Sequence, residues 1–558
     1  MKRRTYYLFK LKGLAPLMLI FLMAGCSEDI LDVKPLNGYS ELDVFEDAAL
    51  LQNYVNGNYR ALRTPLRDEN TFTDGLTDNA YNQHGSAEGQ IKRYTSGEVD
   101  RENGEEITFG LWSHCYSYIR NTNLFFEKIE GSSIPLEQLE VMEGEMRFLR
   151  AYNYFELFKY YGGVPLISET FQLGQESYDV TRGTIDETVA FILNDIDLAI
   201  SLLPSKTELP PAGKASMEAA MALKGRLLLY AASPLYNENG DQEKWKAARD
   251  ANKAVMDLTS VTLVKEFARW ESMFLGNTDE EVIFRRQYTP KNDQGWGVNT
   301  WLFPNGKSGW SNTTPTQDLV DSFELVSGEL PSESASYDSQ DPYVDRDPRF
   351  YETIVYNTAP FQDGTYDPYV DKDDPSNSDL AGIDSRVSRA SPHNASRTGY
   401  TFKKWANDNL AWDAGNTGPY IFYRKTEAYL NYAEAQIELG NESEARNAIN
   451  KIRDRTGMPD ISTSGQALLE DYRNERRVEF VLEDHRFFDI RRWKIGPQVM
   501  NSAKMGVDVL KTGEATFEYD YDLTADSNIF WDDKMYFLPI PFSEIQRSNN
   551  SLEQNPGY

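Results

Sequence analysis

Apolar side chains recur every three or four residues along several stretches of the chain, which is the spacing of one face of an α-helix. The clearest stretch begins at Phe148 and continues through Tyr152 and Phe155 to Phe158. Gly162 and the glycine after it then favour a helix end, because glycine adopts the left-handed conformation that closes many helices. We therefore predict a long helix that ends near residue 161.

Two further helices and a helical hairpin follow the same pattern. Residues 216–232 are rich in Ala and Leu, and residues 426–439 are followed by a Gly-Asn turn and a second apolar face. Ala433, Gly440, Ala445 and Ile449 have the spacing of a tetratricopeptide repeat. Residues 217–254 and 111–160 could form two more such units. The pattern predicts a scaffold of stacked helix pairs, each burying its apolar face on the next.

Other parts of the chain lack helical periodicity. Residues 71–110 and 285–419 are rich in Gly, Asn, Asp, Ser, Pro and aromatic residues. The second stretch is too long for a bare connection, so we expect a folded, loop-rich insertion. We predict a mostly α chain whose helical scaffold comprises about 41–70, 111–284 and 420–500. The loop-rich binding part comprises about 71–110 and 285–419.

The N-terminus has the layout of a targeting segment. A basic head precedes an apolar run at 14–23, and Ala24, Gly25 and Cys26 follow. The run is about half of the roughly 20 residues that span a bilayer. The small residues before Cys26 resemble a bacterial lipobox, which predicts a signal peptide at 1–25, a lipidated tether at 26–40 and one domain at 41–558. The alternative is an ordinary signal peptide with an unrelated cysteine.

Composition removes several classes of function. The 558 residues include 57 Lys and Arg against 87 Asp and Glu, a formal charge of −30. This excess of acid argues against a nucleic-acid partner, which needs a basic surface. Only two cysteines are present, so a disulfide framework and a Cys-rich zinc site are excluded. If Cys26 carries lipid, Cys115 has no partner and is expected to be a small buried hydrophobe.

One charged segment could be read as catalytic. Glu475, Glu479 and Glu483 recur every four residues, with Arg476, Arg486 and Arg492 available to pair with them. A glycosidase needs two carboxylates that face each other across a cleft. Glutamates on one helix side, interleaved with arginine, instead predict a salt-bridge network that supports the fold. We predict no enzyme activity.

Cofactors are not expected, with one possible exception. Asp371, Asp373 and Asp374 could supply oxygen ligands to a structural calcium ion. The glycine and distal glutamate of an EF-hand loop are missing, which favours a solvated acidic loop.

Three tryptophans are candidates for ligand binding. Trp296, Trp301 and Trp310 fall within fifteen residues, among several glycines. Exposed indole rings are unfavourable in water unless they are covered or used. Flat rings suit the apolar C–H faces of sugars, and a few polar groups nearby would set orientation. The alternative is that one or two of these tryptophans pin the loop onto the helices.

A second candidate loop spans residues 74–84. Asp78, Asn79, Tyr81 and Asn82 place acceptors, donors and a ring in a short span. The alternative is a turn that these side chains cap locally.

Segments from one end of the chain to the other resemble one family. They include residues 145–155, 161–166, 231–234, 315–323, 347–349, 424–435, 475–479, 486–493 and 554–558. In this order, behind a lipobox-like cysteine, they resemble the SusD/RagB family, the surface nutrient-binding lipoproteins of Bacteroidetes. Trp310 is favoured as a ligand contact because it lies just ahead of the matching 315–323 segment.

The resemblance implies a mostly α fold with about four tetratricopeptide-like helix pairs and an irregular ligand-binding part. It implies an oligosaccharide ligand, a SusC-like TonB-dependent transporter as partner, and a lipid anchor at the outer face of the outer membrane. The alternative within the family is a receptor for peptides or protein fragments. From other classes, a secreted hydrolase and a lid without a working ligand site remain alternatives.

Overall fold

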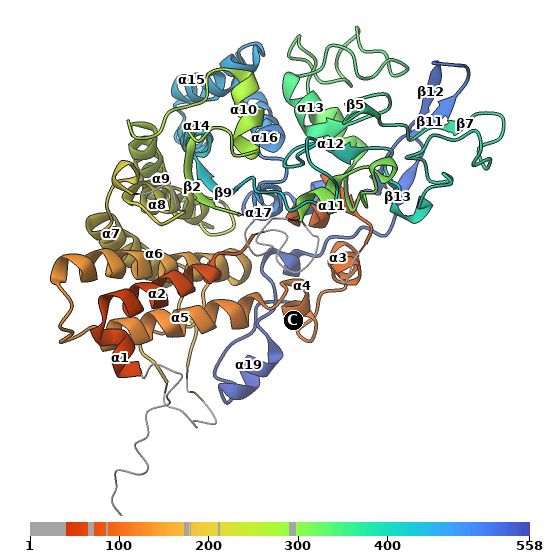
Figure 1. The fold of residues 1–558 in the computed structure, drawn as a ribbon. Helices are drawn as coiled ribbons and strands as arrows, with labels where there is room; N and C mark the ends of the chain where they lie inside the picture. Colours follow the sequence, from red (N-terminus) through yellow and green to blue (C-terminus); the bar gives the residue numbers. More distant parts are fainter. Residues whose placement is uncertain are drawn as a thin grey trace, which may run out of the picture.

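Helices fill one half of the molecule and irregular loops fill the other (Figure 1). The computed structural model describes residues 41–64, 72–84, 87–171, 178, 180–209, 213–289 and 297–558. Within these residues the chain is mostly α-helical, and the prediction of fold class is confirmed. The loop-rich half carries the two segments in which ligand contacts are predicted.

The helical half is a continuous stack. Each helix from α6 to α9 packs on the one before it, starting with α6 on α5, and α14 then packs on α9 although about 170 residues separate them. The predicted pairs correspond to α5 with α6, α8 with α9, and α14 with α15. The stack consists of α1 (Glu41–Glu46), α2 (Ala48–Asn58), α5 (Leu111–Lys128), α6 (Leu136–Tyr161), α7 (Ile185–Leu202), α8 (Met217–Ala232), α9 (Gln242–Met256), α14 (Lys425–Glu438), α15 (Glu442–Arg453) and α16 (Gln466–Glu479).

Local chemistry sets the ends of these helices. α6 ends at Gly162, whose φ of 73° is strained for residues with a Cβ. α7, which the periodicity did not single out, begins with a capping box between Thr184 and Glu187. The last four turns of α6 are buried on almost every side by α5, α7 and neighbouring helices. This helix therefore forms the centre of the helical half.

Shorter helices support the loop-rich half. α3 lies in the stretch at 71–110, where no helix is predicted. It is mostly polar, and among its described side chains only Ile91, Tyr94 and Thr95 are buried. The short helices are α3 (Ala87–Thr95), α4 (Gly104–Ile107), α10 (Phe267–Phe274), α11 (Val298–Leu302), α12 (Gln317–Ser322), α13 (Pro348–Thr353), α17 (Arg486–Arg492), α18 (Gly496–Val499) and α19 (Phe542–Arg547).

Strands in the described residues are short and join distant parts of the chain. β1 (Ala80–Asn82) pairs with β3 (Thr313–Pro315), and β2 (Val282–Arg286) pairs with β9 (Tyr420–Arg424). A three-stranded sheet has the order β12-β11-β7, with β11 and β7 parallel. The strands of this sheet are β7 (Val370–Asp371), β11 (Asp508–Lys511) and β12 (Phe517–Asp520). The remaining strand pairs are β4 (Ile354–Val355) with β8 (Thr401–Phe402), β5 (Pro360–Phe361) with β6 (Gly364–Thr365), and β10 (Lys504–Met505) with β13 (Thr524–Asp526).

The charged segment after residue 470 is part of the core. Glu475 and Glu479 lie on α16, whereas Glu483 lies beyond its end, and all three are buried. Their partners are the buried cations Arg349, Arg424, Arg453, Arg455 and Lys404. Burial alone would raise the pKa of Glu479, but the arginines around it lower that pKa well below its usual range. The predicted structural role is confirmed.

The predicted partners within this segment are wrong. Arg476 pairs with Asp489 at 2.8 Å, and Arg492 pairs with Glu434 at 2.5 Å as well as with Asp489 at 2.7 Å. Arg486 pairs with Asp78. The helix ends at residue 479, so the later arginines turn towards other elements. The four-residue spacing of the glutamates predicts one helix that includes Glu483, whereas α16 ends before that residue.

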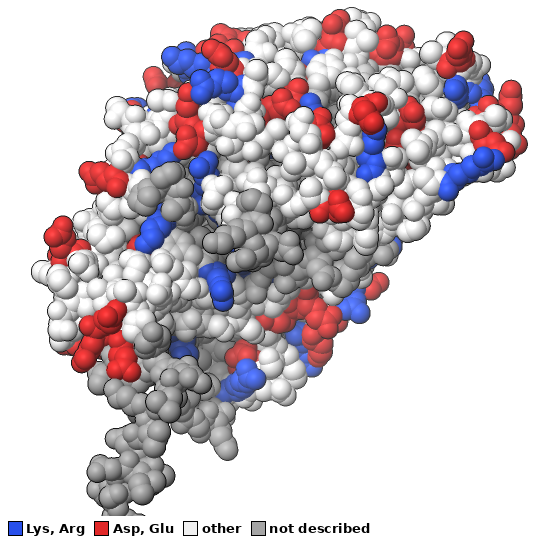
Figure 2. All heavy atoms as spheres, in the orientation of Figure 1, with Lys and Arg blue, Asp and Glu red and all other residues white. Residues whose placement is uncertain are grey.

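Surface charge and membrane propensity add two observations. Acidic and basic side chains are interspersed over the face in Figure 2, without a basic stripe among its described residues. Among the described helices, none is both long enough and apolar enough to cross a membrane.

Candidate functional site

A short antiparallel pairing brings the two predicted binding loops together. β1 and β3 align Ala80 with Pro315 and Asn82 with Thr313, although more than 200 residues separate them in sequence. The pairing continues past β1, because the backbone N–H of Gln83 donates to the Asn312 carbonyl at 2.9 Å. The loop at 74–84 and the loop that carries Trp301 and Trp310 (the tryptophan loop) therefore form one structural unit.

Four aromatic rings form a continuous line across this unit. Trp301 and Trp310 have ring centroids 4.8 Å apart, Trp310 and His84 are 6.1 Å apart, and His84 and His393 are 6.2 Å apart. Each contact is edge-to-face. We call these four residues the aromatic row. It draws on three chain segments, since His393 lies in a 3-10 turn, η7 (Pro392–Asn394).

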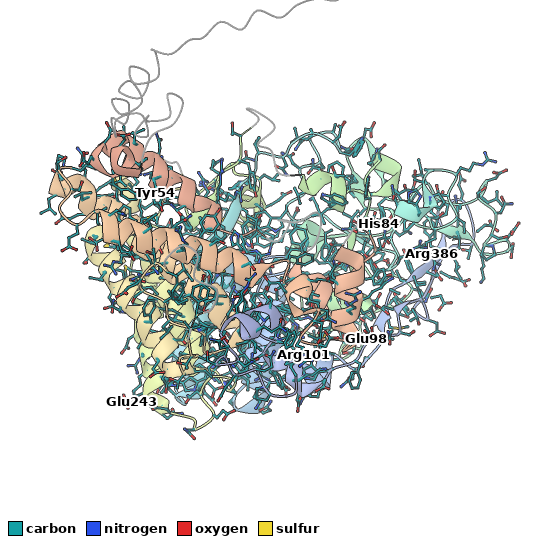
Figure 3. All side chains as sticks on the ribbon, turned by 90° about the horizontal axis from the view of Figure 1, so that it is seen from below. Tyr54, His84, Glu98, Arg101, Glu243 and Arg386 are labelled. Atoms are coloured by element: carbon teal, nitrogen blue, oxygen red, sulfur yellow. The ribbon has the colours of Figure 1, made fainter. Side chains whose placement is uncertain are left out.

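The aromatic row is open to solvent on the loop-rich side. The Trp310 residue is 36% exposed and His393 is exposed, whereas Trp301 and His84 are partly buried. Figure 3 shows His84 on this side of the molecule, far from Glu243 on α9 in the helical half. Contiguous exposed aromatic surface, rather than a single exposed ring, is typical of a binding surface.

Backbone hydrogen bonds hold the two tryptophans in place. The Trp310 N–H donates to the Thr300 carbonyl at 2.9 Å, and the Asn312 N–H donates to the Trp301 carbonyl at 2.7 Å. The loop between them folds back closely, because a Cβ at Gly309 would lie 2.2 Å from the Phe303 carbonyl oxygen. The indole–indole contact thus depends on a tight turn.

Two of the predicted site residues are engaged within the protein. The Asp78 side chain is 10% exposed and accepts from Arg486 at 2.6 Å and 2.9 Å, with Arg477 at 3.1 Å. Asn79 is fully buried, accepts from Arg477 and donates to Asp74 at 2.9 Å. Burial would raise the pKa of Asp78, but Arg477 and Arg486 outweigh it and lower the pKa to about 2. These contacts attach the loop to α16 and α17.

The other predicted residues differ in position. Asn82 is buried, accepts from the Thr313 hydroxyl at 2.8 Å and donates to the His84 carbonyl at 3.2 Å. Tyr81 is partly buried in β1. Trp296 and Cys26 lie outside the described residues. The predictions of ligand contact and lipidation at these four positions stay predictions.

Sequence reasoning missed the two histidines of the row. His84 and His393 are more than 300 residues apart and have neither the spacing of a metal pair nor a periodic pattern. Only the pairing of β1 with β3 and the position of η7 bring them together. The signal for this pairing in the sequence is limited to the short segments that form β1 and β3. Three residues are too few to predict that two strands pair.

Residues considered for other roles lie away from the row. Cys115 is fully buried, and burial raises the pKa of its thiol. Trp405 is buried and donates to the Leu482 carbonyl at 3.1 Å, as expected of a core residue. Asp371 caps the N–H groups of Asp373 and Asp374 at 3.0 Å. Within the described ranges, no group of three or more His, Cys, Asp or Glu side chains is arranged to hold a metal ion.

Comparisons with known proteins agree with this architecture. Residues 280–558 match the model of the SusD family, and residues 29–229 match a model described as "Starch-binding associating with outer membrane". The SusD-like protein P2 of Formosa agariphila is 24% identical, with 97% of this chain and 98% of that protein covered.

Solved structures extend the similarity to the fold. A SusD-like protein from Bacteroides fragilis is 28% identical with a TM-score of 0.77, and 94% of this chain and all of that chain are covered. A SusD-like carbohydrate-binding protein from the same species is 24% identical with a TM-score of 0.76, covering 91% and 99%. The family model covers half of the chain and the structural similarity nearly all of it. The chain belongs to the SusD family.

Proposed function

We propose that this protein is a non-catalytic receptor that captures an oligosaccharide on the aromatic row. The observation that carries the proposal is the set of four edge-to-face rings, assembled from three segments, of which Trp310 and His393 are exposed on the loop-rich half. Ring faces and edges suit the apolar C–H surfaces of pyranose rings, while polar groups at the margins would orient the hydroxyls. A SusD-like structural neighbour is described as carbohydrate-binding, which supports the ligand class.

The row also suits a ligand longer than one sugar. Successive ring centroids are 4.8, 6.1 and 6.2 Å apart, so the row measures at most roughly 17 Å from end to end. Two or more linked sugar rings would be needed to contact both ends. We infer that affinity grows with chain length until the row is covered.

The absence of catalysis is part of the proposal. The three glutamates that could suggest a hydrolase are buried against arginine and lysine. Asp78, the acidic side chain of the predicted site, is likewise paired with two arginines. A glycosidase needs two carboxylates free to act on the same bond, and these carboxylates are bound to cations.

Location and partner follow from the N-terminus and the family. We propose that Cys26 carries lipid, that the protein lies on the outer face of the outer membrane, and that it passes its ligand to a SusC-like TonB-dependent transporter. The match of residues 29–229 to a family associated with the outer membrane supports this location. Metabolic labelling with a fatty-acid analogue, compared between wild type and Cys26→Ala, tests the anchor. Affinity capture with the transporter tests the partner.

The ligand class is tested with a panel of defined oligosaccharides and peptides, followed by titration calorimetry. Trp310 contacts both Trp301 and His84, so Trp310→Ala interrupts the row at its middle. We expect a loss of affinity of roughly fivefold or more, because an aromatic contact contributes about 1 kcal/mol beyond its buried area.

Phe171→Ala is the matched control. Phe171 is 38% exposed, close to the 36% of Trp310, and pairs with Tyr178 on the helical half. Its removal should leave affinity unchanged. Unaltered binding by Trp310→Ala would reject the aromatic row as the site, and binding of peptides instead of sugars would favour the alternative receptor class.

A further inference from the structure

The two halves of the aromatic row meet at one buried amide. Gln83 is 7% exposed and lies between His84, its neighbour in sequence, and Trp310 on the opposing segment. Its Nε2 lies 3.1 Å from the Trp310 carbonyl oxygen and 3.2 Å from Nε2 of the His84 ring. One side chain therefore contacts both residues at the central joint of the row.

The chemistry of these contacts defines the orientation of the amide. A carbonyl oxygen only accepts hydrogen bonds, so the Gln83 atom facing Trp310 must be the NH2 group. The reversed orientation would place two acceptors against each other. Within the described part of the structure, Gln83 Oε1 has no hydrogen-bond partner, so the NH2 contacts alone decide the orientation.

The same NH2 group determines the state of His84. A nitrogen that donates to His84 Nε2 requires that Nε2 carry a lone pair rather than a hydrogen. The neutral ring must then carry its hydrogen on Nδ1. His84 also contacts the Trp310 and His393 rings, and the Asn312 side-chain oxygen accepts from the His84 backbone N–H at 2.7 Å.

We propose that Gln83 is the positioning residue of the ligand site, holding His84 in its neutral, Nδ1-protonated form and fixing its ring against Trp310. The inference rests on the proposed function for its effect on binding, whereas the state of His84 is a property of the free protein. A row fixed before binding loses less entropy when a ligand arrives.

The first test needs no ligand. Protein labelled with [15N]histidine contains four labelled side chains, and His84→Ala identifies the signal of interest. We expect the His84 Nδ1 to give the protonated, pyrrole-type shift and Nε2 the unprotonated type. Gln83→Glu replaces the donor by an acceptor of equal size, so the pattern should reverse to Nε2-protonated. Gln362→Glu is the control, because Gln362 is exposed and donates to the Leu410 carbonyl rather than to a residue of the row.

The second test uses maltohexaose, cellohexaose and laminarihexaose as probes. Affinity for any probe that the wild type binds should fall roughly five- to tenfold in Gln83→Glu and stay constant in Gln362→Glu. If Gln83→Glu does not fold, Gln83→Met removes the donor without adding charge and should leave a mixture of both tautomers.

The two tests separate the two proposals. An Nε2-protonated His84 in the wild type, or an unchanged pattern in Gln83→Glu, would overturn the role of Gln83. An altered tautomer with no loss of affinity for a bound probe would overturn its role in binding. Failure of all three probes with the expected tautomer would instead count against the proposed ligand class and leave the state of His84 established.

Discussion

Asp78 offers a decisive test, because sequence and structure suggest different roles for it. Removal of its charge by Asp78→Asn would unpair Arg486 and weaken the contact with Arg477. The pKa of this carboxyl falls from 3.8 to about 2, since the two arginines outweigh the effect of burial. A pKa that is lowered by nearly two, at about 1.36 kcal/mol per pH unit, corresponds to roughly 2 kcal/mol of stability at neutral pH.

The sign of the pH dependence follows from the direction of the shift. A depressed pKa means that the stabilisation is fully present above about pH 4 and is lost as pH falls towards 2. The difference in unfolding free energy between wild type and Asp78→Asn should therefore be roughly 2 kcal/mol at pH 7 and about half of that at pH 3.

Urea unfolding followed by tryptophan fluorescence measures this difference, and hydrogen exchange over residues 72–84 locates it. Asp413→Asn is the control, because Asp413 is exposed and makes no ion pair within the described part of the chain. If Asp78→Asn kept wild-type stability and exchange but lost affinity for a bound glycan, the structural reasoning would be refuted. Asp78 would then be the ligand contact that its loop position predicted.

Three further perturbations test other parts of the structure. Glu434→Gln should destabilise the protein by ~3 kcal/mol at pH 7, as measured by urea titration. Burial would raise the pKa of Glu434, but Arg492 and the other hydrogen-bond donors to this carboxylate lower it from 4.5 to about 2. Equal stabilities of the two proteins would contradict this. Burial lowers the pKa of Lys504 to about 8, so the native state loses this proton before the unfolded state does. Between pH 8 and 9.5, the free energy of unfolding of the wild type should therefore rise by ~2 kcal/mol relative to that of Lys504→Met. Parallel dependences of the unfolding free energy on pH in the two proteins would argue against this. Gly309→Ala should weaken glycan binding in calorimetry and also lower the melting temperature, since its Cβ would clash with the backbone of the buried Phe303. Undiminished affinity would show that the turn is not needed.

The helical half could be predicted from sequence because its information is local. The apolar spacing that begins at Phe148 and the glycines at 162 and 440 report directly on helix faces and ends. Helix α3 escaped prediction because its nine residues are mostly polar and its few buried side chains do not produce a clear period. What a short helix buries depends on its neighbours, which the local pattern does not contain.

The candidate site was predictable only in part, for a related reason. The choice of the tryptophan loop and of residues 74–84 rested on composition, and both loops do meet. Composition does not distinguish a polar side chain that points to solvent from one that anchors its loop, as Asp78 and Asn79 do. The partners that decide this, Arg477 and Arg486, lie about 400 residues further along the chain.

The aromatic row is built from three chain segments, which has a consequence for how the binding specificity of this surface can change. Trp301 lies in the short helix α11 and His393 in the turn η7, while the hydrophobic centre around α6 lies in the other half of the molecule. A substitution or a short insertion in one of these surface segments can thus alter that part of the row without disturbing the helices around α6. New specificities are accessible one segment at a time, from a scaffold that stays the same.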